Sequence, residues 1–176
     1  MMSTECDDDT CNCGDLCNNR KFQKHEYAHV YPKPSGGKGW GLCAGEFIPR
    51  GTFIMQYIGE IFSTHSDYGK ARVKEYSKST CTYLMKTSKG EVIDPTYKGN
   101  LARFINHSCE PNCITQKWNV LGEICIGIFS VRDIEEDEEL NFDYQFDVYS
   151  TPLTKCLCGA KKCKGYLGLR PTDISA

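Results

Sequence analysis

The stretch Arg103-Phe104-Ile105-Asn106-His107-Ser108-Cys109-Glu110-Pro111-Asn112-Cys113 places an amide, an imidazole and a thiol close together in the chain. It follows Lys98-Gly99-Asn100, a breaker that predicts the start of a short helix, and Pro111 predicts the end of that helix soon after Cys109. Such a helix would present hydrogen-bonding groups and a metal ligand together. Taken alone, the same residues also fit a core histidine beside a buried free cysteine, so the rest of the chain has to decide.

Composition indicates one globular unit. The chain has 176 residues and a hydrophobic share of 40%, which suits one domain with small appendages. Its formal net charge of −2 gives no general attraction to nucleic acid or to membranes. No run approaches the ~20 apolar residues of a membrane span. Residues 1–10 are polar and acidic, so we do not expect them to be a signal peptide.

Cysteine is frequent, with 12 residues, and most of these residues are clustered. In chain order they are Cys6, Cys11, Cys13 and Cys17; Cys43; Cys81; Cys109 and Cys113; Cys125; and Cys156, Cys158 and Cys163. A secreted protein with many disulfides would also be rich in cysteine. Tight groups with C-x-C spacing favour zinc instead, because a tetrahedral site takes four thiolates from short segments. We therefore predict zinc sites and an intracellular protein.

The remaining pattern predicts many short strands and few helices. The predicted elements are a strand at 27–31, two strands within 47–62, a helix within 63–77 capped at Thr64 or Ser66, hairpins at 82–94 and 114–131 with turns at 88–90 and 121–122, and a strand at 140–144. Neither a parallel βαβ alternation nor a glycine-rich phosphate loop is visible. The acidic run at 135–139 is expected to be a solvated loop.

Lys38-Gly39-Trp40-Gly41 follows a turn rich in proline and glycine at 32–37. Two glycines around one tryptophan allow a backbone to approach a ligand closely while the indole covers that ligand. A simple turn beside a buried tryptophan explains the same residues equally well, so this segment alone does not identify a binding site.

Taken together, five segments in order resemble the SET-domain protein lysine methyltransferases. They are Lys38-Gly39-Trp40-Gly41, Tyr57-Ile58-Gly59-Glu60, Arg103 to Cys109, Glu139-Leu140-Asn141-Phe142-Asp143-Tyr144 and Cys156-x-Cys158-x4-Cys163. The resemblance implies a mostly β fold with short helices, the SET-domain β-fold with its pseudoknot, flanked by small zinc-binding segments. It also implies three regions: 1–24 as a partial AWS (pre-SET) zinc segment, 25–150 as the SET catalytic domain, and 151–176 as a post-SET zinc segment and tail.

Two further segments narrow the resemblance to one subgroup. Thr115-Gln116-Lys117-Trp118 and the run from Lys161 to Gly168 look like the Ash, NSD and Set-two group, which methylates lysine 36 of histone H3. The trithorax-like group shares several motifs, so lysine 4 of histone H3 stays an alternative target. The family usually has more upstream cysteines and two zinc ions there. Here nothing precedes Cys6 to bind a second ion, so either the segment holds one zinc or its upstream part has been trimmed.

The resemblance also assigns roles to residues. It implies an enzyme with S-adenosylmethionine as cofactor and two Zn²⁺ ions. The implied cofactor-binding residues are Lys38, Gly39, Trp40, Tyr83, Arg103, Asn106, His107, Tyr144 and Leu157. The implied catalytic residues are Tyr83, Phe142 and Tyr144, and the implied lysine channel is lined by Tyr57, Tyr83, Phe142 and Tyr144. The implied zinc ligands are Cys6, Cys11, Cys13 and Cys17 for one ion, and Cys109, Cys156, Cys158 and Cys163 for the other.

These roles match what methyl transfer to an amine requires. The lysine must be neutral, and aromatic walls favour the neutral amine because they exclude water and so lower its pKa. The Tyr144 hydroxyl can contact the polarised methyl, whereas the alternative for this residue is an ordinary core tyrosine. Phe142 cannot anchor a water beside the lysine nitrogen as a tyrosine would, so we expect dimethylation or trimethylation.

The implied partner is a histone H3 tail or a nucleosome, in the nucleus and on chromatin. We expect no membrane contact, no sequence-specific binding to nucleic acid, and a monomer. A zinc-stabilised module that binds a histone tail without catalysis is the alternative, but such a module would need neither Asn106 and His107 nor Tyr144. Zinc-dependent binding to nucleic acid is poorly supported by the net charge of −2.

Overall fold

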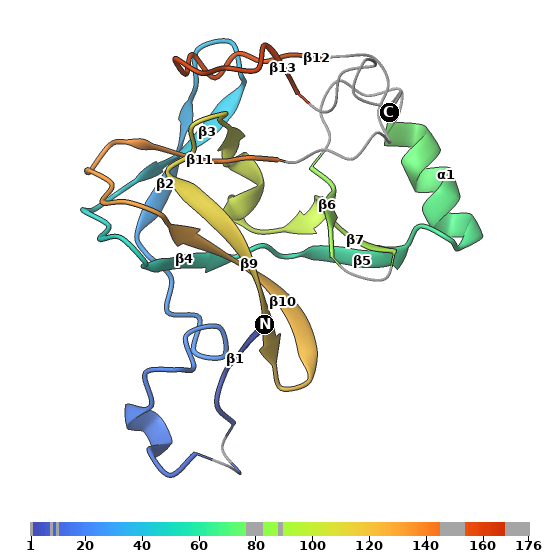
Figure 1. Ribbon diagram of the computed structural model, residues 1–176. Coiled ribbons are helices and arrows are strands. Elements are labelled where there is room, and N and C mark those ends of the chain that lie inside the picture. The colour runs from blue at the N-terminus through green and yellow to red at the C-terminus, as the bar shows by residue number, and fades with distance from the viewer. Residues whose placement is uncertain are drawn as a thin grey trace.

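The computed structural model describes residues 2–7, 9, 11–76, 83–87, 90–144 and 154–167, and short strands dominate these ranges (Figure 1). The strands are β1 (Ser3–Thr4), β2 (Val30–Pro34), β3 (Trp40–Ala44), β4 (Phe53–Gln56), β5 (Gly59–Ser63), β6 (Met85–Lys86), β7 (Glu91–Gly99), β8 (Asn106–His107), β9 (Cys113–Val120), β10 (Glu123–Ser130), β11 (Glu139–Phe142), β12 (Thr154–Lys155) and β13 (Tyr166–Leu167). The helices are η1 (Gly14–Leu16), α1 (Asp67–Tyr76) and η2 (Leu101–Phe104). The mostly β class predicted from the sequence is confirmed. Among the described residues no helix is long and apolar enough to cross a membrane.

The strands of the described residues form four small sheets. Their strand orders are β1-β9-β10-β4, β2-β3-β11-β8, β5-β7-β6 and β12-β13. In the second sheet β11 lies between β3 and β8, so segments from the early, middle and late parts of the chain meet side by side. The helix α1 packs against β5, at one side of the molecule in Figure 1. The N-terminal segment projects away from the body of the sheets in the same view.

The described residues form a larger apolar core, built from several of the sheets, and a smaller one around Phe22 and Phe53. The most buried members of the larger core include Leu42, Ile54, Ile105, Ile128 and Leu140, which come from four strands and from the end of η2. Burying one such side chain contributes about 1.5–3 kcal/mol relative to exposure. The strands β3, β11 and β8 are neighbours in one sheet, and Leu42 of β3 and Leu140 of β11 are buried in this core. The core therefore fixes the positions of the polar residues at the ends of these strands.

The N-terminal segment is fastened to the body by aromatic packing and by one buried acid. The ring of Phe22 lies 4.3 Å from that of Phe53 and 5.6 Å from that of Trp118. A Cβ at Gly127 would come within 2.4 Å of the Phe22 ring, so the absence of a side chain there makes the space for it. The buried Glu5 carboxylate accepts a hydrogen bond from the Phe22 amide at 2.7 Å, and β1 pairs in parallel with β9.

Several elements agree with the sequence prediction. The hairpin of β9 and β10 turns at Leu121 and Gly122, whose φ angles of 51° and 88° match the preferred two-residue turn. The α1 helix begins after Ser66, whose hydroxyl accepts a hydrogen bond from the Gly69 amide at 3.0 Å. Of the two predicted caps, Thr64 and Ser66, the cap is therefore Ser66. The predicted hairpin at 82–94 appears as antiparallel pairing of β6 with β7, while positions 82, 88 and 89 lie outside the described residues.

Two elements differ from the prediction. The strand expected at 27–31 begins at Val30 and runs through Pro34, because β2 is the outer strand of its sheet, where proline costs no ladder hydrogen bond. The strand expected to reach Tyr144 ends at Phe142.

The predicted helix through Asn106, His107 and Cys109 is wrong. A short 3-10 helix, η2, begins after Asn100, whose side chain accepts from the Ala102 amide at 3.3 Å, but it ends at Phe104. Asn106 and His107 instead form β8, which pairs in parallel with β11. The contact with a distant strand outweighs the local helix signal, and no local pattern in 103–113 could have revealed it.

Candidate functional site

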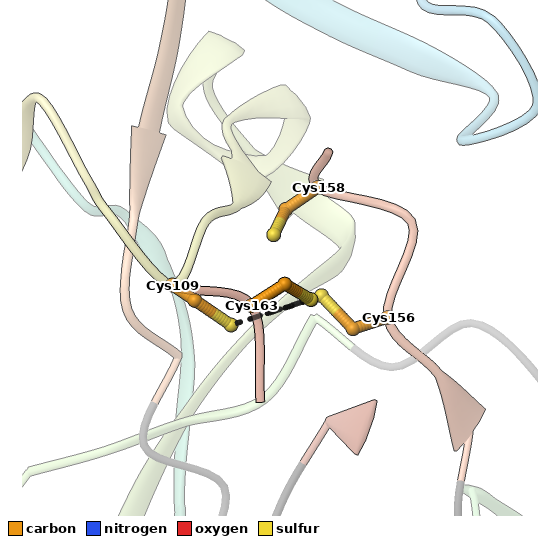
Figure 2. Close-up of side chains that lie close together, drawn as sticks. All are labelled: Cys109, Cys156, Cys158 and Cys163. Atoms are coloured by element: carbon orange, nitrogen blue, oxygen red, sulfur yellow. Dashed lines mark hydrogen bonds between the residues drawn. The ribbon is translucent and has the colours of Figure 1, made fainter. Parts of the chain in front are cut away.

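The Cys109 thiol lies among three thiols from the C-terminal segment. The four sulfurs, of Cys109, Cys156, Cys158 and Cys163, all lie within 4.8 Å of one another (Figure 2). The Sγ of Cys109 is 3.9 Å from that of Cys156 and 4.0 Å from that of Cys163. Tetrahedral zinc with Zn–S bonds of ~2.3 Å separates its sulfurs by ~3.8 Å, whereas a disulfide needs ~2.05 Å. The four thiols therefore fit one zinc ion and do not fit disulfides.

Backbone groups support this cluster. The Lys164 amide donates to the Cys109 sulfur at 3.4 Å, and the Gly165 amide donates to the Cys163 sulfur at 3.3 Å. Burial raises the pKa of Cys158, but backbone groups of Cys109 and Ala160 and the neighbouring thiols outweigh it and lower that pKa to about 6. These contacts favour the thiolate form of Cys158, which is the form that binds a metal.

The N-terminal cysteines form a less complete group. The sulfurs of Cys6, Cys11 and Cys17 lie within 4.8 Å of one another. Cys13 is exposed and lies outside this group, although the adjacent Cys11 thiol is close enough to raise the pKa of Cys13. Three of the four predicted ligands are therefore brought together, and the fourth lies beside them.

Cys113 does not belong to either group. It is buried, and its thiol donates to the Asn112 side chain at 3.3 Å. Burial raises the pKa of the Cys113 thiol to about 12, so it stays protonated and behaves as a core residue. Cys81 lies outside the described residues.

Tyr144 is held beside the β8–β11 pair at three points. Its hydroxyl donates to the Ile105 carbonyl at 2.7 Å, and its backbone amide donates to Nδ1 of His107 at 3.2 Å. Its ring lies 4.9 Å from the ring of Phe142, as expected for residues two apart on an extended chain. The orientation of the Tyr144 hydroxyl is thus fixed before any ligand binds.

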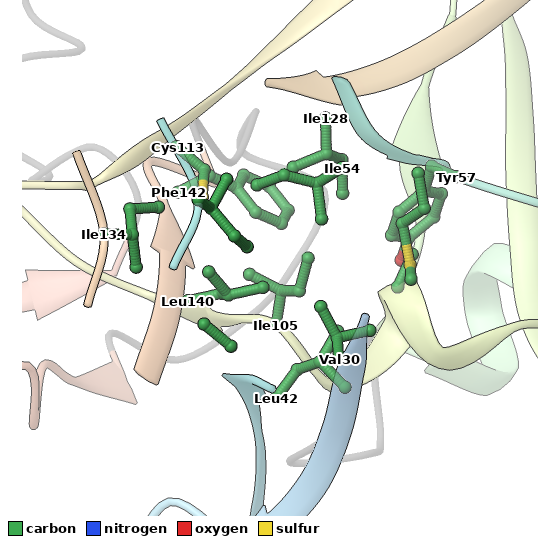
Figure 3. Close-up of a cluster of buried hydrophobic side chains, with 14 of the residues drawn as sticks. Val30, Leu42, Ile54, Tyr57, Ile105, Cys113, Ile128, Ile134, Leu140 and Phe142 are labelled. Atoms are coloured by element: carbon green, nitrogen blue, oxygen red, sulfur yellow. The ribbon is translucent and has the colours of Figure 1, made fainter. Parts of the chain in front are cut away.

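Tyr57 adds a third aromatic ring to the same cluster. Tyr57 and Phe142 both lie among the core side chains, with Tyr57 at one edge of the group (Figure 3), and Tyr144 packs against the cluster. The Tyr57 hydroxyl donates to the Tyr83 carbonyl at 2.5 Å. Burial, followed by the nearby Tyr144, raises the pKa of Tyr57 far above its ordinary value. Tyr57, Phe142 and Tyr144 can therefore form an apolar wall whose Tyr57 hydroxyl stays protonated.

The turn that joins β2 to β3 ends at Gly39, and Trp40 is the first residue of β3. Gly39 has a φ of +82°, a conformation that favours glycine, and a Cβ there would meet nothing within 4 Å. The Trp40 side chain is 55% exposed, which rules out the alternative of a buried tryptophan beside a simple turn. The Trp40 carbonyl accepts from the side chain of Asn106 at 3.2 Å, so this turn and β8 are joined. The result is an open backbone surface beside an exposed indole.

Glu139 connects these elements, although the sequence did not single it out as a site residue. Its carboxylate accepts from Lys38 Nζ at 2.8 Å, from the Ser35 hydroxyl at 2.8 Å and from Asn106 Nδ2 at 2.7 Å. Burial raises the pKa of Glu139, but the bonds from Lys38, Asn106 and Ser35 outweigh it and leave the pKa below its ordinary value. A Cβ at Gly41 would come within 2.7 Å of the Glu139 carboxylate, which explains the second glycine of the turn.

The expectation that 135–139 is a solvated loop is therefore wrong at its end. Glu135 and Glu136 are exposed as predicted, whereas Glu138 accepts from Asn112 Nδ2 at 2.9 Å and Glu139 holds the turn. Glu139 is the first residue of β11, one residue before the predicted start of that strand, and its carboxylate bonds to Lys38 in the β2–β3 turn. A run of like charges in sequence conceals such a cross-strand partner.

The other predicted site residues have the following places. The Arg103 guanidinium donates to the Pro95 carbonyl at 3.2 Å and lies 4.9 Å from the centre of the Phe104 ring. Leu157 is 53% exposed and sits between two of the clustered cysteines. Both assignments to the cofactor, and that of Tyr83, remain predictions.

Comparison with known proteins identifies two segments. A sequence profile of the SET domain matches residues 39–145, and one of the AWS domain matches residues 1–25. Histone-lysine N-methyltransferase ASHH1 of Arabidopsis thaliana is 47% identical over 170 residues, which cover 97% of this chain and 35% of that protein. Histone-lysine N-methyltransferase SETD2 of Homo sapiens is 45% identical over 170 residues, 96% of this chain and 6% of that protein.

A third relative and a solved structure agree with these matches. The histone-lysine N-methyltransferase of Schizosaccharomyces pombe described as H3 lysine-36 specific is 43% identical over 170 residues, 96% of this chain and 21% of that protein. The crystal structure of the methyltransferase domain of human SETMAR has a TM-score of 0.82 and 32% identity, and covers 95% of this chain and 67% of that one. The chain thus spans about a third or less of the length of these three relatives.

Proposed function

The chain belongs to the SET-domain family, and from this membership we propose that it is a histone-lysine N-methyltransferase that uses S-adenosylmethionine. The relatives from Arabidopsis, human and fission yeast carry the name of that activity. The fission-yeast relative is described as H3 lysine-36 specific, which supports lysine 36 of histone H3 as the target here. Lysine 4 is the second candidate, because the trithorax-like enzymes that act there share several of the motifs. A nuclear, chromatin-bound site of action follows from a histone substrate.

The hydrogen bond of the Tyr144 hydroxyl carries this proposal. Because that hydroxyl donates to the Ile105 carbonyl at 2.7 Å, its oxygen keeps lone pairs that can accept weak C–H···O contacts. S-adenosylmethionine, when bound, supplies an electrophilic methyl group on a sulfonium. A phenol oxygen and a backbone carbonyl fixed side by side suit contact with the polarised hydrogens of such a methyl, at ~0.5–1 kcal/mol per contact. A module that only binds a histone tail has no need of this arrangement.

The apolar wall of Tyr57, Phe142 and Tyr144 would remove water from the substrate amine. Tyr57 and Phe142 are 4% and 6% exposed, so a lysine side chain that enters beside them and Tyr144 would lose water. Desolvation favours the neutral amine, which is the nucleophile. Positioning of the reactants can contribute up to ~7–11 kcal/mol in well-oriented reactions, and a wall held by the core keeps that geometry.

The residues near the β2–β3 turn fit the cofactor. Gly39 leaves space along the backbone, Trp40 offers an exposed indole, and Asn106 is held beside both by Glu139. We assign Lys38, Gly39, Trp40, Asn106 and the backbone of His107 to cofactor binding. Both ring nitrogens of His107 are already engaged by protein groups, so its ring is not part of this assignment.

We further propose two zinc ions and the three regions expected from the sequence. One ion is held by Cys109, Cys156, Cys158 and Cys163, and the other by Cys6, Cys11 and Cys17 with Cys13 as the fourth ligand. The regions are an AWS segment at 1–24, a SET domain at 25–150 and a post-SET segment at 151–176. The first ion would attach the post-SET segment to Cys109, which lies two residues after the end of β8.

A methylation assay tests the function. The protein is incubated with S-adenosylmethionine and with nucleosomes or single histones, and the products are mapped by mass spectrometry. Nucleosomes in which arginine replaces either lysine 36 or lysine 4 of histone H3 serve as controls. We expect product at lysine 36 that disappears only when lysine 36 is replaced. Tyr144→Phe should reduce the rate at least about 10²-fold while the variant still binds cofactor in a thermal-shift assay. Absence of product from a zinc-loaded protein that binds a histone H3 peptide would favour the non-catalytic alternative.

A further inference from the structure

The His107 ring lies between two parts of the site, the cluster of Cys109, Cys156, Cys158 and Cys163 and the residue Tyr144. Its side chain is 8% exposed. Its Nδ1 is 3.2 Å from the backbone nitrogen of Tyr144, and its Nε2 is 3.3 Å from the sulfur of Cys109. One rigid ring therefore reaches from a proposed zinc ligand to the backbone of the proposed catalytic tyrosine.

The two contacts determine which ring nitrogen carries the proton. A backbone amide can only donate, so at 3.2 Å Nδ1 is the acceptor for Tyr144, and the Asp143 carboxylate oxygen, 3.7 Å from the same nitrogen, lies beyond hydrogen-bond distance. The proton of the neutral ring is then on Nε2 and points at the Cys109 sulfur. A zinc-bound thiolate is a good acceptor for such a charge-assisted bond. The ring thus has one donor and one acceptor, and each faces a different partner.

We propose that His107 is a positioning residue that couples the cysteine cluster to Tyr144. The ring of His107 also packs edge-on against the Tyr144 ring, with centroids 5.4 Å apart and an interplanar angle of 67°. Movement of Cys109 would therefore displace both the backbone and the ring of Tyr144. The inference rests on the proposed function, since it gives a catalytic meaning to the position of Tyr144.

A second link between the same two parts is weaker. Lys164 Nζ lies 3.3 Å from the carboxylate of Asp143, and the Lys164 amide contacts the Cys109 sulfur. That lysine side chain is 61% exposed, and exposed ion pairs contribute only ~0–1 kcal/mol. The buried ring of His107 is the stiffer of the two links. Partners that orient a metal ligand typically change metal affinity or activity about 10–100-fold when they are replaced.

Two substitutions of His107 each remove one of the two hydrogen bonds of its ring and keep the other. In His107→Gln the side-chain amide can occupy the place of Nε2 and keep the N–H···S bond, but the acceptor for Tyr144 is lost. In His107→Asn the amide oxygen can occupy the place of Nδ1 and keep the bond to Tyr144, but the donor to Cys109 is lost. The exposed His65, which lies outside the site, provides the matched control His65→Gln.

The experiment compares zinc release, turnover and cofactor affinity in the zinc-loaded protein. Zinc transfer to a chelating indicator should be about 10-fold faster in His107→Asn and within about twofold of wild type in His107→Gln. Turnover should fall at least about 10-fold in both variants, while the calorimetric Kd for S-adenosylmethionine changes less than about threefold. His65→Gln should match the wild type in every measurement.

A merely structural histidine would give a different result. Both variants would then lose stability, zinc and cofactor affinity together, and equal zinc release from the two variants would overturn the proposal. Full turnover by His107→Gln would overturn it as well. If the wild type shows no methyl transfer, the proposed function fails separately, and the zinc-release comparison still decides whether His107 supports Cys109.

Discussion

Replacing Glu139 with glutamine tests whether this carboxylate holds the β2–β3 turn, which we propose binds the cofactor. The change keeps the size of the side chain and removes its charge. The glutamine oxygen can still accept from Ser35 and Asn106, which contact the same carboxylate oxygen. Its amide nitrogen would then face the ammonium of Lys38, so that two donors oppose each other where an ion pair of 2.8 Å stood.

The size of the effect follows from the burial of the pair. The side chains of Lys38 and Glu139 are 21% and 28% exposed. A hydrogen bond to a charged group contributes about 1.5–3 kcal/mol, and partial exposure places this one near the lower end. We expect Glu139→Gln to lower the free energy of unfolding by about 1–2 kcal/mol. Loosening of the turn should raise the Kd for S-adenosylmethionine about 10-fold, equivalent to about 1.4 kcal/mol, with a smaller change in kcat.

The pH dependence gives a further check. The pKa of Glu139 is lowered in the folded protein, so the unfolded state binds more protons near and below pH 4.5. The stabilisation by this carboxylate is complete above that ordinary value and is lost as the pH falls through the folded pKa. The difference in stability between wild type and Glu139→Gln should therefore be constant near neutral pH and shrink in acid.

Urea denaturation at several pH values and calorimetric titration with S-adenosylmethionine measure these quantities. Glu136→Gln is the matched control, because it removes the same charge from an exposed residue of the same acidic run. It should leave both quantities unchanged within error. If Glu139→Gln binds cofactor as tightly as the wild type and unfolds with the same free energy, Glu139 does not hold the turn.

Three further predictions concern neighbouring parts of the site. Phe142→Tyr should shift the products toward monomethyl-lysine, by time-resolved mass spectrometry of a histone H3 peptide, and an unchanged ratio would make Phe142 an ordinary core residue. Metal analysis should find two zinc ions per chain, with their removal by a chelator lowering the melting temperature, whereas disulfides in peptide maps would contradict the zinc assignment. Asn112→Ala should lower the free energy of unfolding in urea by roughly 2–4 kcal/mol, because the fully buried Asn112 bonds to both Glu139 and Asn141. A loss below about 1 kcal/mol would mean that its partners find replacements.

Local patterns in the sequence predicted the local structure well. The turn at Leu121-Gly122 and the cap at Ser66 depend on residues next to each other, and both are confirmed. The C-terminal cysteine cluster could be predicted in part, since three tail cysteines leave a tetrahedral site one ligand short. The assignment of Cys109 as the fourth ligand and of Tyr144 depended on resemblance to a family, because spacing alone cannot bring distant segments together.

The features that the sequence did not reveal depend on distant partners. Asn106 and His107 form a strand because their backbone groups pair with those of β11, and this pairing outweighs the local helix signal around them. Glu139 reads as one acid among five, yet its bonds reach Ser35 and Lys38 across the sheet. Phe22 fits over the body because Gly127 lacks a side chain. In each case the stabilising contact joins residues that are far apart in the sequence, so no short segment contains both partners.

The register of β11 links these observations. Residues alternate sides along a strand, so a shift of one residue would move Glu139 away from Lys38 and turn Phe142 away from the core. Asn112 prevents such a shift: its side chain donates to the Glu139 carbonyl at 2.9 Å and accepts from the Asn141 amide at 2.8 Å. The side chain of Asn141 in turn accepts from the Asn112 amide at 3.1 Å. The buried side-chain amide of Asn112 therefore fixes the register that places Glu139 at the β2–β3 turn and Phe142 in the core, and this accounts for its complete burial.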